Sequence, residues 1–334
     1  MNNKKKKILV TGGAGYIGSI TVQVLKKEGF EPIIFDSLET GHKESVAQEK
    51  FYQGDLVKDV NLLDEVFKKE KPEAVIHFAA MSLAGESVIN PQKYFTNNLV
   101  GVLNLLKVML ENKVLKIVFS STAAVYGEPK KVPIDEDDDK NPTSPYGESK
   151  LMIEKILTRY GQAYGLNSIA LRYFNACGAF LDGSLGEDHS PESHLIPAAM
   201  RAALNQKHFK LFGNDYPTPD GTCIRDYIHV LDLAQAHILA LKNFQKGFQF
   251  YNVGTNHGFS VLEILKTIKK VSGIDFGIDI IERRAGDPAR LIAKAEKIKK
   301  ELGWKAKYSD LETIIKSAWK WHSRHLSGYK KIST

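Results

Sequence analysis

Thr11-Gly12-Gly13-Ala14-Gly15-Tyr16-Ile17-Gly18 is the stretch that decides the fold of this chain. It follows Lys7 and the apolar run Ile8-Leu9-Val10, which we predict to form a buried strand, and it opens a segment of helical periodicity at residues 17–27. The spacing of Gly12, Gly15 and Gly18 departs by one residue from the common dinucleotide fingerprint. Both glycine spacings serve the same purpose, because a tight turn lets backbone amides at a helix N-terminus approach a pyrophosphate.

An acidic residue further along supports a dinucleotide ligand. Asp36 follows the predicted strand at residues 31–35, about 20 residues beyond the glycine loop. A carboxylate at this position accepts hydrogen bonds from the adenine ribose hydroxyls and repels a 2′-phosphate. We therefore predict NAD, rather than NADP, as the cofactor.

The first half of the chain alternates strand and helix signals outward from the glycine loop. Further strands are predicted at residues 51–53, 74–78, 116–120 and 168–172, and further helices at residues 60–69, 97–111 and 145–164. This rhythm predicts an α/β fold with a Rossmann-type, doubly wound parallel sheet. Beyond residue 176 the alternation of strand and helix signals becomes less regular, and loops rich in Gly, Pro and Asp interrupt it. We expect an NAD-binding domain over residues 1–176 and a smaller, interleaved substrate-binding domain over residues 177–334, with an approximate boundary.

Composition narrows the class of protein. Of the 334 residues, 43% are hydrophobic and 25% charged, which is typical of soluble globular proteins. The net charge of +7 is dispersed among acidic residues, so a nucleic-acid partner is not expected. No stretch approaches the ~20 apolar residues of a membrane span. Cys177 and Cys223 are too few for a disulfide framework, which suits the cytoplasm, and neither has metal-ligand spacing, so no metal site is expected.

Tyr146 and Lys150 form a candidate catalytic pair. Their separation of four residues places them on one face of a helix, and Ser144 with Pro145 predicts that this helix begins just before them. A free phenol has a pKa near 10, so ionising it at neutral pH costs roughly 4 kcal/mol. A neighbouring ammonium lowers that cost. The pair therefore predicts a base that takes a proton from a sugar or alcohol hydroxyl while hydride leaves its carbon.

Two other predicted strands end in candidate cofactor contacts. Asp55 follows the third strand, where its carboxylate can accept a hydrogen bond from the adenine amino group. Phe78, Ala79 and Ala80 end the fourth strand, where small residues let the backbone lie against the cofactor.

Several motifs together identify a family. The glycine loop, His77-Phe78-Ala79-Ala80, Ser120-Ser121-Thr122 and the Tyr146/Lys150 pair resemble the extended short-chain dehydrogenase/reductase family. Within it, the sequences at residues 172–175, 212–218 and 220–230 resemble the UDP-sugar 4-epimerases. The resemblance covers about residues 7 to 325.

The resemblance implies a role for individual residues. Tyr146 would be the catalytic base and acid, Lys150 would bind the nicotinamide ribose and tune Tyr146, and Thr122 would hydrogen-bond the sugar 4-hydroxyl. Positions that match NAD contacts are Tyr16, Ile17, Asp36, Asp55, Leu56, Phe78, Asn97 and Phe174. Positions that match the UDP-sugar site are Asn175, His194, Leu195, Lys210, Leu211, Phe212, Arg225, Arg284 and Asp287. The fixed donor forks of Arg225 and Arg284 suit a diphosphate, and Asp287 suits the uridine ribose diol.

The implied activity is reversible epimerisation at C4 of a UDP-hexose, UDP-galactose to UDP-glucose, through a transient 4-keto sugar and tightly held NAD. A homodimer formed by the helices near residues 92–112 and 145–164 is also implied. The chain departs from the family pattern at Ser82 and His194, which replace a lysine and an asparagine. The position that gates sugar size falls at Arg290 or Leu291, and an aliphatic gate would admit N-acetylated sugars.

Other functions remain as alternatives. A nucleotide-sugar 4,6-dehydratase carries an Asp-Glu pair right after the Thr122 position, where this chain has Ala123-Ala124, which argues against dehydration. Epimerisation of UDP-N-acetylglucosamine, a UDP-pentose or a UDP-uronate is harder to exclude, because it differs by a few pocket contacts. An NAD-sensing protein without activity has no need of Thr122, Tyr146 and Lys150 together.

Overall fold

The structure, a computed structural model, describes residues 5–284 and 287–329. The chain divides into two compact units, each assembled from separate segments. The first comprises the described residues of Met1–Gly127, Asp137–Tyr173 and Ala234–Tyr251, and the second comprises those of Glu128–Glu136, Phe174–Leu233 and Asn252–Thr334.

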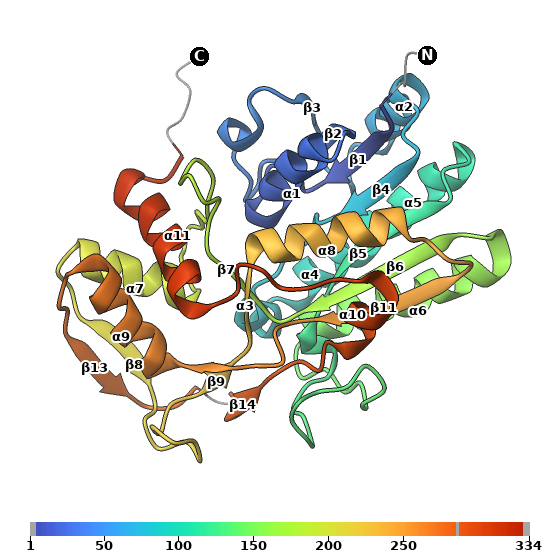
Figure 1. The fold of residues 1–334 in the computed structure, drawn as a ribbon. Coiled ribbons are helices and arrows are strands. Elements are labelled where there is room, and N and C mark those ends of the chain that lie inside the picture. The colour runs from blue at the N-terminus through green and yellow to red at the C-terminus, as the bar shows by residue number, and fades with distance from the viewer. Residues whose placement is uncertain (1–4, 285–286, 330–334) are drawn as a thin grey trace. The chain divides into compact units, whose positions relative to one another are not determined.

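The first unit alternates strands and helices along most of its length (Figure 1). Its strands are β1 (Lys7–Thr11), β2 (Glu31–Asp36), β3 (Lys50–Gln53), β4 (Ala74–His77), β5 (Lys116–Thr122), β6 (Asn167–Tyr173) and most of β11 (Phe248–Val253). Its helices are α1 (Tyr16–Lys27), α2 (Val60–Glu70), α3 (Ala84–Ile89), α4 (Pro91–Phe95), α5 (Gly101–Glu111), α6 (Pro145–Tyr164) and most of α8 (Val230–Lys242). Shorter turns are η1 (Lys43–Val46), η2 (Thr96–Val100) and η3 (Ala123–Val125).

Within the described residues, the strands of this unit form a seven-stranded sheet in the order β11-β6-β5-β4-β1-β2-β3. Parallel pairing joins β6 to β5, β5 to β4, β4 to β1, β1 to β2 and β2 to β3. The strand order reverses at β1, which lies between β2 and β4. Ligands of such sheets bind outside the carboxyl ends of the strands at this reversal. The predicted Rossmann-type doubly wound fold is therefore confirmed.

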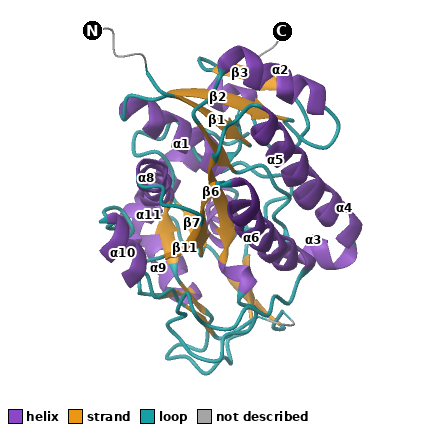
Figure 2. Ribbon diagram, turned by 90° about the vertical axis from the view of Figure 1, so that its right-hand side faces the viewer, coloured by secondary structure: helices purple, strands orange, loops and turns teal. Residues whose placement is uncertain are grey.

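Helices cover both faces of this sheet (Figure 2). In that view α1 and α8 lie on one face, and α2, α5 and α6 lie on the other. The strands read as continuous apolar runs because both faces are buried. On the face of α2, α5 and α6, a core cluster joins strand residues such as Leu9, Val75 and Ile117 to Val66 and Leu105 on the helices.

Predicted and observed elements agree closely in this half of the chain, and one region differs. The helix that begins at Pro145 with Ser144 as its N-cap is confirmed, since the Ser144 side chain accepts a hydrogen bond from the Gly147 amide. The helix predicted for residues 97–111 instead begins as the π-helical turn η2 and continues as α5, with α3 and α4 before it. Among the described residues, no helix combines the length and apolar character that crossing a membrane requires.

The second unit is built from shorter elements. Its strands are β7 (Asn175–Cys177), β8 (Phe209–Phe212), β9 (Ile224–Arg225), β10 (Tyr227–His229), β12 (Phe259–Ser260), β13 (Ile278–Ile281) and β14 (Arg290–Leu291). They pair as β10-β7, β12-β9-β14 and β13-β8. Its helices are α7 (Leu195–Leu204), α9 (Val261–Ser272), α10 (Glu296–Leu302) and α11 (Leu311–Arg324). Apolar faces of α7, α9 and α11 pack together through residues such as Met200, Leu265 and Ile315.

Candidate active site

The glycine loop between β1 and α1 contains glycines of two kinds. At Gly12, which has φ +72°, an added Cβ would lie 2.4 Å from the Ala79 nitrogen, and at Gly18 it would lie 2.2 Å from the Gly12 oxygen. The protein's own packing therefore requires glycine at both positions. At Gly15 an added Cβ would meet only the Gly12 oxygen, at an ordinary 3.4 Å. Packing does not explain Gly15, whereas a phosphate at the N-terminus of α1 does. The loop fits a dinucleotide.

Asp36 lies beside this loop at the end of β2. Its Oδ2 accepts a hydrogen bond from the Ala14 amide at 2.9 Å, and its Oδ1 accepts one from the Leu38 amide at 2.8 Å. The residue is 7% exposed, and burial raises the pKa of its carboxyl despite these amides. Because each carboxylate oxygen has two lone pairs, both retain acceptor capacity for ribose hydroxyls.

The end of β4 borders the same loop. The Phe78 and Ala79 amides both donate to the Thr11 oxygen, at 2.8 and 3.1 Å. The Phe78 ring contacts the ring of His237 on α8, with centroids 4.6 Å apart. Phe78, Ala79 and the glycine loop therefore lie together at the reversal of the strand order.

Asp55, Leu56 and Asn97 occupy the next predicted cofactor positions. The Asp55 Oδ1 accepts a hydrogen bond from the Val57 amide at 2.7 Å, so this carboxylate also shapes the turn after β3. The Leu56 carbonyl accepts one from the Asn104 side chain at 2.9 Å, which ties the turn to α5. Asn97 is half-buried in η2. The cofactor contacts of these three residues stay predictions.

Tyr146 and Lys150 lie one turn apart near the N-terminus of α6, and both are buried, with 9% and 3% exposure. The Lys150 ammonium lies 5.9 Å from the centre of the Tyr146 ring. It donates a hydrogen bond to the Ser120 carbonyl oxygen at 2.8 Å. This bond fastens the lysine to the end of β5, which also carries Thr122.

Thr122 joins this pair through a hydrogen bond with the Tyr146 side chain. Burial raises the pKa of the Tyr146 phenol well above its usual value, and the Thr122 hydrogen bond lowers it in part. Burial also lowers the pKa of Lys150 to about 7. In this setting an added positive charge favours the phenolate, the form that can accept a proton. A phenol, a hydroxyl and an amine so arranged can exchange a proton with an alcohol.

Two sets of buried polar residues that support this pair were not predicted. The Asn98 side chain donates to the Ser149 hydroxyl at 3.0 Å and to the Met81 carbonyl at 3.1 Å, so it links η2, α6 and the loop after β4. Glu154, four residues beyond Lys150 on α6, pairs with Arg172 of β6 at 2.6 Å. The available signal for Glu154 was its spacing on the Tyr146 and Lys150 face.

In the second unit, four of the predicted UDP-sugar residues come together. Arg225 Nη2 lies 3.5 Å from Asp287 Oδ1. The Arg284 guanidinium lies over the Phe212 ring, 3.8 Å from its centre. The Asp287 amide donates to the Arg284 carbonyl at 3.3 Å, which joins the two pairs. Two guanidinium groups, one carboxylate and an aromatic ring therefore line one region.

The other predicted substrate residues of this unit are more scattered. The Asn175 side chain donates to the Asp226 carbonyl at 2.9 Å, next to Arg225. Phe174, which precedes Asn175 and is a predicted NAD contact, is 9% exposed. On β8, Leu211 is buried in the helical core while Lys210 is exposed.

His194 and Leu195 mark the start of α7. His194 is the N-cap residue and Leu195 is the first helical residue. The His194 imidazole contacts the buried carboxylate of Glu187. The uridine contact expected of His194 stays a prediction.

Comparison with known proteins places this geometry in a family. The model of the NAD dependent epimerase/dehydratase family matches residues 8–254. The chain is 52% identical over 325 residues to a UDP-glucose 4-epimerase of Halalkalibacterium halodurans, covering 96% of this chain and 97% of the relative.

Solved structures agree with this finding. The UDP-glucose 4-epimerase from Brucella ovis in complex with NAD superposes with a TM-score of 0.91 at 46% identity, over 94% of this chain and 97% of that one. The Bifidobacterium longum enzyme in complex with NAD⁺ and UDP gives a TM-score of 0.92 at 40% identity, over 97% of this chain and 100% of that one. With its glycine loop, Asp36 and the Tyr146 pair on a Rossmann-type sheet, the chain belongs to the NAD dependent epimerase/dehydratase family.

Proposed function

We propose that this protein interconverts UDP-galactose and UDP-glucose by NAD-dependent epimerisation at C4. One observation carries the proposal: Thr122, Tyr146 and Lys150 meet at the end of β5 in the same unit as the glycine loop. The relatives named above are UDP-glucose 4-epimerases, and the match to this chain covers nearly their whole length.

NAD is held in this proposal by the cofactor contacts predicted from the sequence, of which Phe174 is one. The others are Gly12, Gly15, Tyr16, Ile17, Gly18, Asp36, Asp55, Leu56, Phe78, Ala79, Ala80, Asn97, Tyr146 and Lys150. When bound, NAD accepts the hydride from C4 of the sugar and returns it. Asp36 selects against a 2′-phosphate through its negative charge.

Tyr146 moves the proton. Its phenolate takes the proton of the sugar 4-hydroxyl, directly or through Thr122, and returns it after the 4-keto sugar has presented its other face. Lys150 supplies the positive charge that lowers the cost of the phenolate. The reaction is redox-neutral, because the hydride that leaves C4 comes back to the same carbon.

UDP is held by residues of the second unit. The forks of Arg225 and Arg284 match diphosphate oxygens, and Asp287 matches the uridine ribose diol. Asn175, His194, Leu195, Lys210, Leu211 and Phe212 complete the proposed contacts. Tight holding of UDP leaves the hexose as the part free to turn, which inversion at C4 requires.

The test is incubation of the purified protein with UDP-galactose without added NAD, with the epimer ratio read by NMR. We expect UDP-glucose to accumulate to a constant ratio, and the same ratio to be reached from UDP-glucose. Failure of a preparation that carries NAD to form either epimer would overturn the proposal, and a partner protein captured without turnover would favour an NAD-sensing role.

N-acetylated sugars are proposed as additional substrates, because Leu291 is the better candidate for the gate. In the parallel pair β9 and β14, Leu291 lies opposite Arg225 and Arg290 lies opposite Ile224. Neighbouring residues on paired strands share a face, so Leu291, not Arg290, shares the face of the proposed diphosphate ligand. We expect Leu291→Tyr to reduce turnover of UDP-N-acetylgalactosamine far more than that of UDP-galactose. Equal loss for both sugars would argue against this gate.

A cytoplasmic homodimer is also proposed. Exposed apolar side chains on the helices near residues 92–112 and 145–164 support the dimer, including Leu103 at 40%, Met152 at 37% and Tyr164 at 55% exposure. The two unpaired cysteines support a reducing compartment. Light scattering coupled to size-exclusion chromatography tests the dimer, and a single-chain mass at micromolar concentration would reject it.

A further inference from the structure

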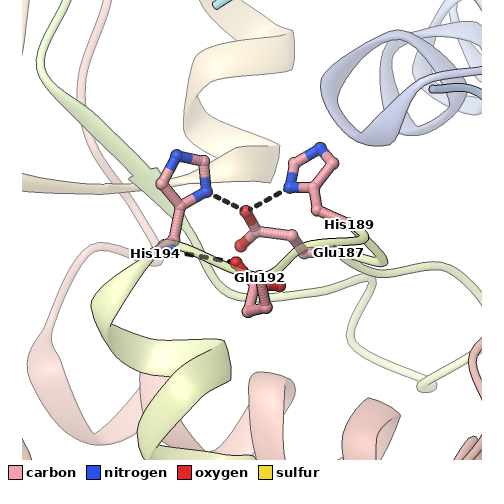
Figure 3. Close-up of side chains that lie close together, drawn as sticks. All are labelled: Glu187, His189, Glu192 and His194. Atoms are coloured by element: carbon pink, nitrogen blue, oxygen red, sulfur yellow. Dashed lines mark hydrogen bonds and ion pairs between the residues drawn. The ribbon is translucent and has the colours of Figure 1, made fainter. Parts of the chain in front are cut away.

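Two imidazoles and two carboxylates lie close together in the segment that precedes α7. Glu187, His189, Glu192 and His194 each offer one ligand atom, and these atoms all lie within 4.8 Å of one another. Figure 3 shows both imidazoles turned toward the carboxylate of Glu187. Part of the cluster is therefore already converged on a single point.

That point is one carboxylate oxygen. Glu187 Oε1 lies 3.1 Å from Nδ1 of His189, and Nδ1 of His194 contacts the same oxygen. In tetrahedral zinc sites the nitrogen and oxygen ligands lie about 2.0–2.2 Å from the metal, which separates neighbouring ligand atoms by roughly 3.3 Å. The Glu187–His189 pair at 3.1 Å is close to that separation, and ligand atoms as much as 4.8 Å apart would have to draw together around the ion.

Hydrogen bonds position the two acidic residues of the cluster. The Glu187 side chain is 3% exposed, and its backbone carbonyl accepts a hydrogen bond from the Trp321 indole at 3.0 Å. Glu192 Oε1 accepts hydrogen bonds from the Ser193 and His194 amides, both at 2.9 Å. The Trp321 contact therefore positions the backbone that carries Glu187, and the two amides orient the Glu192 carboxylate.

A second observation points to a missing ligand of Glu192. Within the described part of the chain, Glu192 Oε2 is buried and has no hydrogen-bond partner, and its side chain is 4% exposed. The Arg201 guanidinium approaches it only to 3.8 Å. A buried carboxylate oxygen left without a hydrogen bond is costly and needs an explanation. A cation bound between Glu192 and the two histidines would supply it.

We propose that Glu187, His189, Glu192 and His194 form a binding site for a divalent transition metal, with Zn²⁺ as the best match. Two imidazole nitrogens and two carboxylate oxygens are ligands that Zn²⁺ accepts, and the two negative charges balance the ion. The site would fasten the segment before α7 to its start, where His194 is the N-cap residue.

Protons are the competitors of the metal. Burial disfavours a charged His194, but its contact with Glu187 outweighs burial and raises the pKa of that imidazole to about 9. A metal must displace these protons to bind. A purely hydrogen-bonded Glu–His cluster is therefore the outcome that would overturn the proposal.

The test uses the full chain without a histidine tag. After treatment with a chelator and dialysis, we expect Zn²⁺ titrated by calorimetry to bind at one ion per chain, and Co²⁺ to give the intense visible bands of four-coordinate cobalt. Both measurements are made without a UDP-sugar, so they do not depend on the proposed substrate role of His194.

Variants locate the site. His189→Ala and Glu192→Gln should each weaken Zn²⁺ binding by at least about 10- to 100-fold, since even changes around metal ligands have this effect. The matched control is His208→Ala, because His208 also pairs with a carboxylate, that of Asp279 at 2.7 Å, but belongs to no such cluster among the described residues. It should bind as the unaltered chain does.

The proposal fails if the chelated protein takes up no Zn²⁺, or takes up the same amount with either ligand removed. It also fails if Co²⁺ gives only the weak bands of six-coordinate cobalt. Glu192→Gln keeps the size of the side chain, so it decides the question if His189→Ala does not fold.

Discussion

At the scale of single residues, Tyr146 combines two opposing conditions. Its phenol is buried, which raises its pKa, yet the proposed chemistry needs it to release a proton. A hydrogen bond from Thr122 favours the phenolate only in part. Positive charge near the ring adds to this stabilisation, and Lys150, whose Nζ lies 5.9 Å from the ring centre, supplies it when protonated.

The first prediction concerns this phenol. Tyr146→Phe should lower kcat by about 10²- to 10⁴-fold, because a positioned acid–base group contributes that much to proton transfer. NAD should remain bound, since the change removes one hydroxyl. The measurements are kcat by NMR and NAD content by absorbance after denaturation.

Tyr164→Phe is the control for this variant. Tyr164 lies 18 residues beyond Tyr146 at the other end of the same helix, roughly 27 Å away at 1.5 Å per residue, and it is 55% exposed, so its hydroxyl is remote from the site. We expect near-normal turnover. A Tyr146→Phe enzyme as fast as the control would exclude Tyr146 as the base.

The second prediction separates the two kinds of glycine in the loop. Gly15→Val should prevent NAD binding while leaving the fold intact, because Gly15 has an ordinary φ of −76° and an added Cβ meets no close neighbour. Gly18→Ala should instead lower the stability of the protein, since its Cβ would lie 2.2 Å from the Gly12 oxygen. The measurements are NAD content and urea unfolding. A Gly15→Val protein that purifies with full NAD would contradict the loop assignment.

At the scale of elements, the position of α6 depends on a buried ion pair. The Glu154 carboxylate accepts hydrogen bonds from Arg172 of β6 at 2.6 and 3.0 Å and from the Ser121 hydroxyl of β5 at 2.6 Å. Arg172 also donates to the Tyr126 hydroxyl at 2.9 Å. This network holds the helix that carries Tyr146 and Lys150 against the two strands.

The third prediction removes one partner of this pair. Glu154→Ala should destabilise the protein by about 3–5 kcal/mol, because it leaves the buried guanidinium without its counterion. Adding Arg172→Met should recover part of the loss, since the uncompensated charge is gone. Urea unfolding measures both. A double variant less stable than Glu154→Ala would contradict this account of the loss.

The fourth prediction concerns the pairing of β1 with β4. His77 Nδ1 lies 2.7 Å from the Thr11 hydroxyl, and burial lowers the pKa of this histidine to about 3. The folded state therefore binds the proton less readily than the unfolded state, whose histidine pKa is near 6.5. The contribution of His77 to the free energy of unfolding is fully present above pH 6.5. It is lost as the pH falls toward 3, by about 1.4 kcal/mol per pH unit.

His77→Gln tests this sign. The variant should be less stable at neutral pH, where the unaltered chain keeps its buried hydrogen bond, but its stability should fall less steeply with acid. His229 and His322 titrate in the same direction and are present in both proteins, so the difference isolates His77. Parallel curves of unfolding free energy between about pH 6.5 and pH 5 would show that His77 does not contribute.

At the scale of the whole molecule, cofactor binding and folding are linked. A ligand that binds only the folded state stabilises it by about 2.7 kcal/mol at 100 times its dissociation constant. We expect NAD to raise the Tm of the cofactor-stripped protein, and NADP to raise it much less at the same concentration, because Asp36 repels a 2′-phosphate. Equal shifts for the two cofactors would contradict the role given to Asp36, and Asp36→Asn should narrow the difference between them.

The alternation of strands and helices, the glycine loop and the start of α6 were all predictable from sequence. Each depends on short-range physics: apolar periodicity, a glycine turn, and the Ser144 cap with Pro145 at the first turn. These signals act within a few residues of one another. The position of Asp36 beside the loop was also predictable, because the order of strand, turn, helix and strand fixes where the second strand ends.

Long-range contacts were decided only by the tertiary structure. The segment Ala234–Tyr251 belongs to the first unit, and β11 lies beside β6 in its sheet. No local sequence pattern predicts this placement. The links from Asn98 to Ser149 and from Glu154 to Arg172 join residues 51 and 18 positions apart. The convergence of His189 and His194 on Glu187 arises from the path of an irregular loop. Sequence periodicity reports the face that an element buries, whereas these contacts depend on which elements the packed core brings together.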